Sequence, residues 1–381
     1  MRARDMSALL SGEEEMGSRF IRETIERLTP YKPGTPIDQV KRELGLNEVI
    51  KLASNENPLG PSPLAVAAMQ QALQEVRLYP DNDCVELMNA LEAHLEVPQE
   101  CIIVGRGSDE VIHLMGLAFV NPGEEVMMAD PPFALHESTA IVMDAVPVKV
   151  PLKDYVHDLA AMRKAITPRT KLVFIANPHN PTGTIVARRE LELFMEGLPE
   201  GILVAFDEAY REYVDSPEFP DSLEYVRQGR NVVVLRTFSK IYALAGLRVG
   251  YGIAPPHIMR HLRQVRQPFN VSNVAQAAAT ASLADRNQVE RSRRVNEEGK
   301  RYLEREFRRL GLRFAPSQAN FVFVDLRRDS VAVYRRLLQE GVIVRTGDIF
   351  DLPTHIRVTI GSREENEKFI SALEKVLGES A

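Results

Sequence analysis

The sequence predicts an α/β protein with a large domain on a mostly parallel sheet and a small α+β domain after it. Short runs that are apolar on both faces recur between residues 101 and 254 ("CIIVG", "EEVMMA", "KLVFIAN", "GILVAF", "NVVVLR", "RVGYGIA"), and helical patterns such as "SDEVIHLMGLAFV" and "FALHESTAIVMDA" separate them. Such an alternation indicates parallel strands covered by helices on both sides. With 381 residues, the chain is also long enough for a second, smaller core.

The segments before the large domain have a different character. Residues 1–16 are polar and lack an apolar period, so we expect a disordered extension whose deletion changes neither melting nor activity. Next we expect a helix in "RFIRETIERL" and an extended arm in "TPYKPGTP", where prolines and a glycine disfavour helix. Residues 17–50 are expected to be part of the small domain.

The large domain is expected to span residues 51–285, with a long helical stretch at 255–282 near its end. The small domain is expected to span residues 286–381. It opens with a helix in "QVERSRRVNEEGKRYLEREFRRLG" that ends at Gly311, because glycine readily closes a helix. The remainder, "FAPSQANFVFVDL", "SVAVYRRLLQEG", "VIVRTG" and "HIRVTIGS" before a last helix, reads as strands with a helix between them.

Composition argues against several classes of protein. The net charge of −6 offers no basic field for a polyanion, so we expect no nucleic acid partner. No apolar run is long enough to span a bilayer, and charges stand where a signal peptide needs apolar residues. Cys84 and Cys101, the two cysteines, have no metal-ligand spacing, so we expect free thiols, no metal site and a cytoplasmic location.

Polar residues follow the apolar runs, where the carboxyl ends of parallel strands meet and ligands bind. Ser108 and Asp109 begin a helix after "CIIVGRG", which suits either a phosphate or a plain helix cap. Asn180 stands in a turn, "NPHNPTGT". Asp207 directly follows "GILVAF", where a carboxylate is costly unless a cation meets it. Lys240, beside "IYALAGL", must either extend to solvent or be held for chemistry.

These residues make sense together if the pocket holds a flat, cationic, phosphorylated ring with an aldehyde, which describes pyridoxal 5'-phosphate. Asp207 would keep the pyridine nitrogen protonated, Asn180 and Tyr210 would bond the phenolate oxygen, and Phe133 would lie against the ring. Lys240, desolvated by its neighbours, would bind the aldehyde and move the Cα proton. The residues expected around the phosphate are Ser108, Asp109, Thr237, Ser239 and Arg248.

Longer segments carry a family resemblance from about Tyr31 to near the C-terminus. They are "YKPGTP", "KLASNENPLGPSP", "LYPD", "GRGSDE", "DPPFALH", "NPHNPTGT", "FDEAYREY", "RTFSKIYALAGLRVGYG", "ANFVFV" and "IRVTIG". The chain resembles the fold type I pyridoxal-phosphate-dependent aminotransferases, in particular those that act on histidinol phosphate. The resemblance implies a homodimer with shared active sites. It also implies transamination of L-histidinol phosphate with 2-oxoglutarate, which yields imidazole acetol phosphate and glutamate in histidine biosynthesis.

The resemblance also implies roles for individual residues. Lys240 becomes the lysine that holds the cofactor, Asp207 the partner of the pyridine nitrogen, and Arg248 a phosphate ligand. Further implied residues are Tyr79, reaching the phosphate from the neighbouring subunit, and Asn57 and Arg357 as substrate contacts. The other candidate substrate contacts are Tyr31, Asn180 and Arg345, and Arg345 in "VIVRTG" reads equally as a surface residue. The chain departs from the family's usual pattern at Phe133, where many members have tyrosine, and at Arg106, where asparagine or serine is usual.

Other functions remain open at this stage. An aromatic amino-acid aminotransferase acting on phenylalanine or tyrosine, or a dual-specificity enzyme, would keep the same cofactor residues. So would a lyase, a decarboxylase or an acyl-transferring synthase on this fold. A non-catalytic regulator that binds the cofactor would need an attached DNA-binding domain, which the short polar N-terminal segment does not provide.

Overall fold

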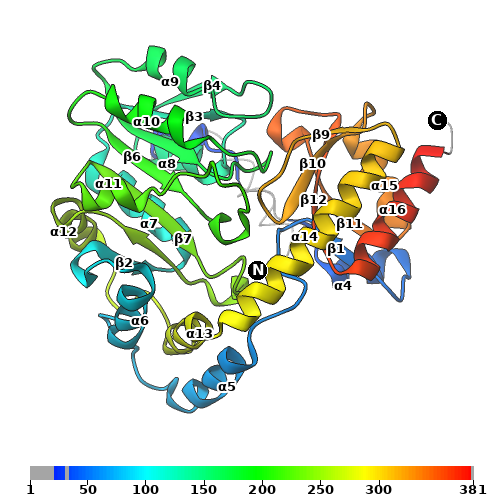
Figure 1. The fold of residues 1–381 in the computed structure, drawn as a ribbon, viewed down its shortest axis with the longest axis horizontal. Helices are drawn as coiled ribbons and strands as arrows, with labels where there is room; N and C mark the ends of the chain where they lie inside the picture. Colours follow the sequence, from blue (N-terminus) through cyan, green and yellow to red (C-terminus); the bar gives the residue numbers. More distant parts are fainter. Residues whose placement is uncertain (1–20, 31–33, 379–381) are drawn as a thin grey trace, which may run out of the picture.

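The computed structural model describes residues 21–30 and 34–378. Over these residues the strands form two sheets, of seven and five strands, and the long helix α14 packs against the five-stranded sheet (Figure 1). The extension predicted at 1–16 and the arm residues 31–33 lie outside the described residues. Within the described part of the chain, no helix is both long and apolar enough to cross a membrane.

The large sheet has the strand order β2-β8-β7-β6-β5-β3-β4. Its strands are β2 (Ile102–Gly105), β3 (Glu125–Asp130), β4 (Val146–Pro151), β5 (Thr170–Ala176), β6 (Leu203–Asp207), β7 (Val232–Thr237) and β8 (Gly250–Ile253). The neighbours from β4 through β7 pair in parallel, whereas β8 is antiparallel to both β7 and β2. The predicted mostly parallel sheet is therefore confirmed.

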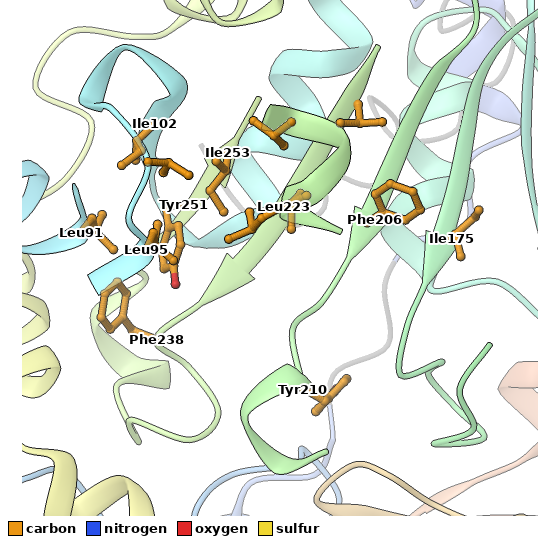
Figure 2. Packing of buried hydrophobic residues seen from close by; sticks show 14 of the residues in the cluster. Leu91, Leu95, Ile102, Ile175, Phe206, Tyr210, Leu223, Phe238, Tyr251 and Ile253 are labelled. Carbon is orange, nitrogen blue, oxygen red and sulfur yellow. The ribbon is translucent and has the colours of Figure 1, made fainter. Parts of the chain in front are cut away.

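Helices cover both faces of the large sheet, as the apolar runs predicted. Strand residues alternate between two cores, so Ala205 packs on one face and Phe206 on the other. The core that contains Phe206 is shown in Figure 2. Its helices are α5 (Pro63–Ala72), α6 (Val85–Leu95), α9 (Leu159–Ala165), α10 (Arg188–Glu196), α11 (Leu223–Arg227) and α13 (Asn273–Ala284). The opposite core is built on α7 (Gly107–Phe119), α8 (Ala134–Val142) and α12 (Pro256–Val265).

The small sheet has the strand order β1-β11-β12-β10-β9. Its strands are β1 (Ile50–Leu52), β9 (Arg313–Phe314), β10 (Phe321–Asp325), β11 (Val342–Thr346) and β12 (His355–Thr359). It packs against α14 (Arg286–Arg309), α15 (Ser330–Gln339) and α16 (Arg363–Gly378). Asp285 caps α14 by accepting from Gln288 N at 3.1 Å, so a new helix starts where we place the boundary between the two domains. That boundary remains our interpretation.

The remaining elements are short. They are α3 (Glu23–Glu26), α4 (Ile37–Leu44) and the 3₁₀ turns η2 (Leu73–Glu75), η3 (Gln99–Cys101), η4 (Arg211–Tyr213), η5 (Ala245–Leu247) and η6 (Asp348–Phe350). The helix predicted in "RFIRETIERL" is thus only one turn in its described part, because Arg22 has an extended backbone. The helical stretch predicted at 255–282 is two helices, since Pro268 lies in the loop between α12 and α13 and lacks the N–H that a continuing helix needs.

Candidate active site

A cavity of about 630 Å³ lies between the carboxyl ends of the large-sheet strands and residues of the small sheet. Its wall combines these strand ends, the N-terminus of α7, residues 27–30, and residues of β11 and β12. The sequence-predicted residues that line it are Ser108, Asp109, Phe133, Asn180, Asp207, Tyr210, Thr237, Ser239, Lys240, Arg248, Arg345 and Arg357. Side chains separated by up to 249 residues in sequence are therefore neighbours here.

Lys240 is half-buried in this wall, three residues after the end of β7. Its Nζ donates to the carbonyl oxygen of Ser54 at 3.3 Å and lies 5.6 Å from the centroid of the Tyr210 ring. The neighbours that looked apolar in sequence, Ile241 and Leu244, are buried behind it. The amine of Lys240 therefore faces the cavity from a wall that limits its solvation.

Asp207 ends β6 with only 6% of its surface exposed. One carboxylate oxygen lies 3.2 Å from His136 Nε2, and the other accepts the Ala209 N–H at 3.2 Å. His136 stacks on Phe174 with ring centroids 4.1 Å apart, which holds the imidazole in place. The buried carboxylate is thus fixed in orientation and directed at the cavity.

The N-terminus of α7 meets Arg248 in the wall of the cavity. Gly107 has φ of +76°, a backbone conformation that favours glycine, and a Cβ on it would lie 3.0 Å from Arg248 Nη2. Arg248 Nη2 donates to Asp109 Oδ2 at 2.8 Å. Burial raises the pKa of the Asp109 carboxyl, and the Arg248 charge opposes that rise. Helix N–H groups, a guanidinium and the hydroxyls of Thr237 and Ser239 together suit a phosphate.

Tyr210 is buried beside Asp207 and accepts a hydrogen bond from Asn55 Nδ2 at 2.9 Å. Burial raises the pKa of its phenol, so its O–H stays protonated and can donate to a ligand oxygen. Asn55 has φ of +57°, a backbone conformation that asparagine tolerates better than most residues.

Two buried arginines form the wall contributed by the small sheet. Arg345 and Arg357 are opposite one another in the β11–β12 register, with 8% and 7% of their surfaces exposed. Arg357 donates to Asn180 Oδ1 through Nη1 and to the carbonyl of Ala53 through Nη2 at 2.8 Å. Two guanidiniums in the cavity wall favour an anionic ligand.

Two predicted site residues lie elsewhere, and a third is outside the described residues. Asn57 does not line the cavity: its side chain is buried and donates to Ile241 O at 2.8 Å and Ser292 Oγ at 2.9 Å. Tyr79 is 82% exposed and stacks on Phe269 with centroids 4.9 Å apart, away from the cavity of its own chain. Tyr31 lies outside the described residues.

The structure also adds residues that sequence reasoning missed. Asn55, His136 and the carbonyl of Ser54 each contact a predicted site residue. The signals were weak: "SNENP" contains two asparagines, and pattern alone does not tell which faces a ligand. His136 sits three residues after Phe133 in "DPPFALH", one helical turn along α8, but a lone histidine there is equally a core residue.

Comparison with known proteins identifies the family. The model for aminotransferase class I and II matches residues 47–373. The histidinol-phosphate aminotransferase of Moorella thermoacetica is 56% identical over 357 residues, which cover 93% of this chain and 92% of that protein. That of Caldicellulosiruptor saccharolyticus is 48% identical over 94% of this chain and its own full length.

Solved structures agree with the fold. Histidinol-phosphate aminotransferase from Sinorhizobium meliloti, in complex with pyridoxal-5'-phosphate, has a TM-score of 0.87 at 28% identity, covering 95% of this chain and 98% of that one. Aspartate aminotransferase from Thermus thermophilus with maleate has a TM-score of 0.81 at 22% identity, covering 93% and 99%, which supports the shared fold alone. The chain is an aminotransferase and belongs to the class I and II family, within its histidinol-phosphate aminotransferase group.

Proposed function

We propose that the enzyme transaminates L-histidinol phosphate with 2-oxoglutarate, using pyridoxal 5'-phosphate held in the cavity, as a step of histidine biosynthesis. The observation that carries the proposal is that Lys240, Asp207 and a phosphate-binding corner line one cavity together with Arg345 and Arg357. Relatives that share about half of the sequence carry this substrate in their names.

The donor set fits the cofactor. The phosphate would lie at the N-terminus of α7, between Ser108, Thr237, Ser239 and Arg248, which all line the cavity. Asp109, whose carboxylate pairs with Arg248, would orient that guanidinium and offer its own N–H.

The ring of the cofactor has its own partners in the cavity wall. Phe133 lies edge-on to His136, with ring centroids 5.3 Å apart, and offers a face for the ring. When bound, the cofactor supplies an aldehyde that carries the amino group and a ring that accepts electrons from the substrate Cα.

Different residues of the chain would bind or transfer the protons of the reaction. Lys240 Nζ would take the Cα proton and return it. Partial burial removes some of the water that stabilises the charged form of the amine, which favours the neutral form that can accept a proton. Asp207 Oδ2, oriented by His136, would hold the proton of the pyridine nitrogen. The hydroxyl of Tyr210 and the amide nitrogen of Asn180 would bond the ring oxygen.

A comparison of amino donors tests the substrate. We expect kcat/KM to be highest for histidinol phosphate with 2-oxoglutarate as acceptor, and measurable for phenylalanine and tyrosine. Secondary aromatic activity is expected because Phe321 and Phe350 flank Arg357, with ring centroids 5.3 and 5.8 Å from its guanidinium carbon. A higher value for phenylalanine would make this an aromatic aminotransferase. A higher value for alanine or aspartate would contradict the substrate class altogether.

Replacing Arg357 with alanine is expected to lower kcat/KM by about a hundredfold for donor and acceptor alike. A guanidinium binds the phosphate of one and a carboxylate of the other through the same paired hydrogen bonds, and such a contact contributes a few kcal/mol. Arg363→Ala, which removes an arginine paired with Glu367 on the surface, is the matched control and should stay near wild type. Loss for only one of the two substrates would show that Arg357 is not a shared anchor.

We further propose a cytoplasmic homodimer in which Tyr79 reaches the phosphate of the neighbouring subunit. Exposed apolar side chains near Tyr79 in sequence support a protein contact there: Leu64, Leu73, Val76, Leu78 and Val85. Tyr79→Phe should then weaken retention of the cofactor during dialysis while the dimer persists. A fully active monomer in light scattering would contradict the shared site.

A further inference from the structure

A buried ion pair lies directly behind the candidate site. Arg236 Nε donates to Glu208 Oε2 at 3.0 Å, and Nη2 lies 2.9 Å from the same oxygen. The side chains are 4% and 0% exposed. In sequence, Glu208 directly follows Asp207 and Arg236 directly precedes Thr237, so the pair is flanked by cavity residues on both strands.

The pair lies on the face of the sheet away from the cavity. Phe206 and Val234 pack in the core shown in Figure 2, and alternation along a strand places Glu208 and Arg236 on that same face. Asp207 and Thr237 point the other way, toward the cavity. The pair thus links the ends of β6 and β7 from behind.

Backbone hydrogen bonds also hold the two strands together beyond their last paired residues. Regular pairing of β6 with β7 ends at Asp207 and Leu235, and Glu208 N then donates to Leu235 O at 2.9 Å. Lys240 is three residues after the end of β7. In the short segment that joins them, Phe238 N donates to Val249 O at 3.1 Å. A shift of β7 against β6 would therefore change the separation of Asp207 and Lys240.

Stability alone does not explain charges in this position. Removing two ions from water is costly, and apolar residues of similar size commonly serve a core at least as well. Glu208 Oε1 has no hydrogen-bond partner among the residues that the structure describes, so the carboxylate is not fully satisfied. Arg211 Nε, at 3.6 Å from Oε2, is a second and more exposed cation. What an ion pair adds over apolar contact is directional geometry.

We propose that Glu208 and Arg236 are positioning residues that hold Asp207 and Lys240 at the separation the reaction needs. The inference rests on the proposed function, since it concerns two groups that would act on opposite sides of the cofactor. The two residues would not contact substrate or cofactor. They would act by fixing the relative positions of the ends of β6 and β7.

The test replaces the pair with apolar residues, Glu208→Met together with Arg236→Met. Three quantities are measured: the melting temperature without cofactor, the Kd for pyridoxal phosphate by equilibrium dialysis, and the pH midpoint of the bound cofactor's visible absorbance. We expect melting at or above wild type, a raised Kd, a shifted midpoint, and kcat lowered by roughly a hundredfold with KM changed less. Wild-type Kd, midpoint and kcat in a stable double variant would overturn the proposal.

Glu208→Asp keeps both charges and shortens one side chain by a methylene, so it decides the matter if the double variant does not fold. It should shift the absorbance midpoint and lower kcat, as the double variant does. Unchanged values would again overturn the proposal. The control is Glu125→Gln, at the start of β3, where the carboxylate is 4% exposed and pairs with Arg169 at 2.8 Å.

Glu125→Gln should melt at a lower temperature than the wild type yet keep the wild-type Kd and midpoint, since Glu125 lies at the opposite end of the strands. If it shifts them equally, the effect is general loosening and the proposal fails. A wild-type protein that does not bind pyridoxal phosphate would instead contradict the proposed function.

Discussion

Lys240→Ala is expected to lower transamination by roughly a thousandfold or more, the largest effect of any single substitution in this chain. Lys149 also lines the cavity, but it is on β4 and pairs with Glu137 at 3.1 Å, whereas Lys240 reaches the cavity from the end of β7 and lies beside Tyr210. The variant should still retain cofactor through the phosphate corner, because Ser108, Thr237 and Arg248 are untouched. Steady-state kinetics and dialysis of the bound cofactor measure the two effects separately.

Covalent labelling identifies the lysine independently of activity. Borohydride reduction of the wild-type protein with pyridoxal phosphate should attach the cofactor to Lys240, as located by mass spectrometry, and should attach none in the variant. Lys171→Ala serves as the matched control, since Lys171 is on β5 and not among the residues lining the cavity. Attachment to a second lysine in Lys240→Ala would assign the anchor to that residue instead.

Asp207→Ala is expected to have the second-largest effect, a loss of kcat of roughly a hundredfold or more with folding nearly intact. The ring nitrogen would lose the carboxylate that keeps its proton, and the cofactor would accept electrons poorly. Folding should persist because removing a buried carboxylate also removes its desolvation cost, and His136 remains stacked on Phe174. Kinetics with histidinol phosphate and a thermal melt measure both parts.

The matched control for this prediction is Asp221→Asn, which removes a carboxylate from an exposed pair with Arg227. Its turnover should stay close to wild type. Asp207→Asn should resemble Asp207→Ala in turnover, because an amide keeps the shape but cannot hold the proton as a carboxylate does. Near-normal turnover in either Asp207 variant would remove this residue from the proposed mechanism.

The strand ends were predictable because local sequence encodes them. A fully apolar run followed by a charged residue, as at Asp207, indicates a buried parallel strand and places that residue at the ligand-binding edge. By contrast, β4 was not predicted, since its two prolines and half-exposed side chains resemble a loop. An edge strand tolerates proline because one row of its N–H groups needs no partner.

Contacts across long sequence separations were not predictable from pattern. Pairing of β1 with β11 joins residues about 290 apart and sets the chain near residue 50 against the cavity. It also decides that Asn55, rather than Asn57, meets Tyr210.

The sequence by itself determined the fold class, the residues at the strand ends and the chemistry they can perform, because strand and helix periods and residue types are local properties. The tertiary structure alone decided the contacts around that cavity: it set Arg345 opposite Arg357, placed His136 against Asp207, and paired Glu208 with Arg236 behind them. These are outcomes of packing two sheets and their helices, and packing depends on the whole chain at once.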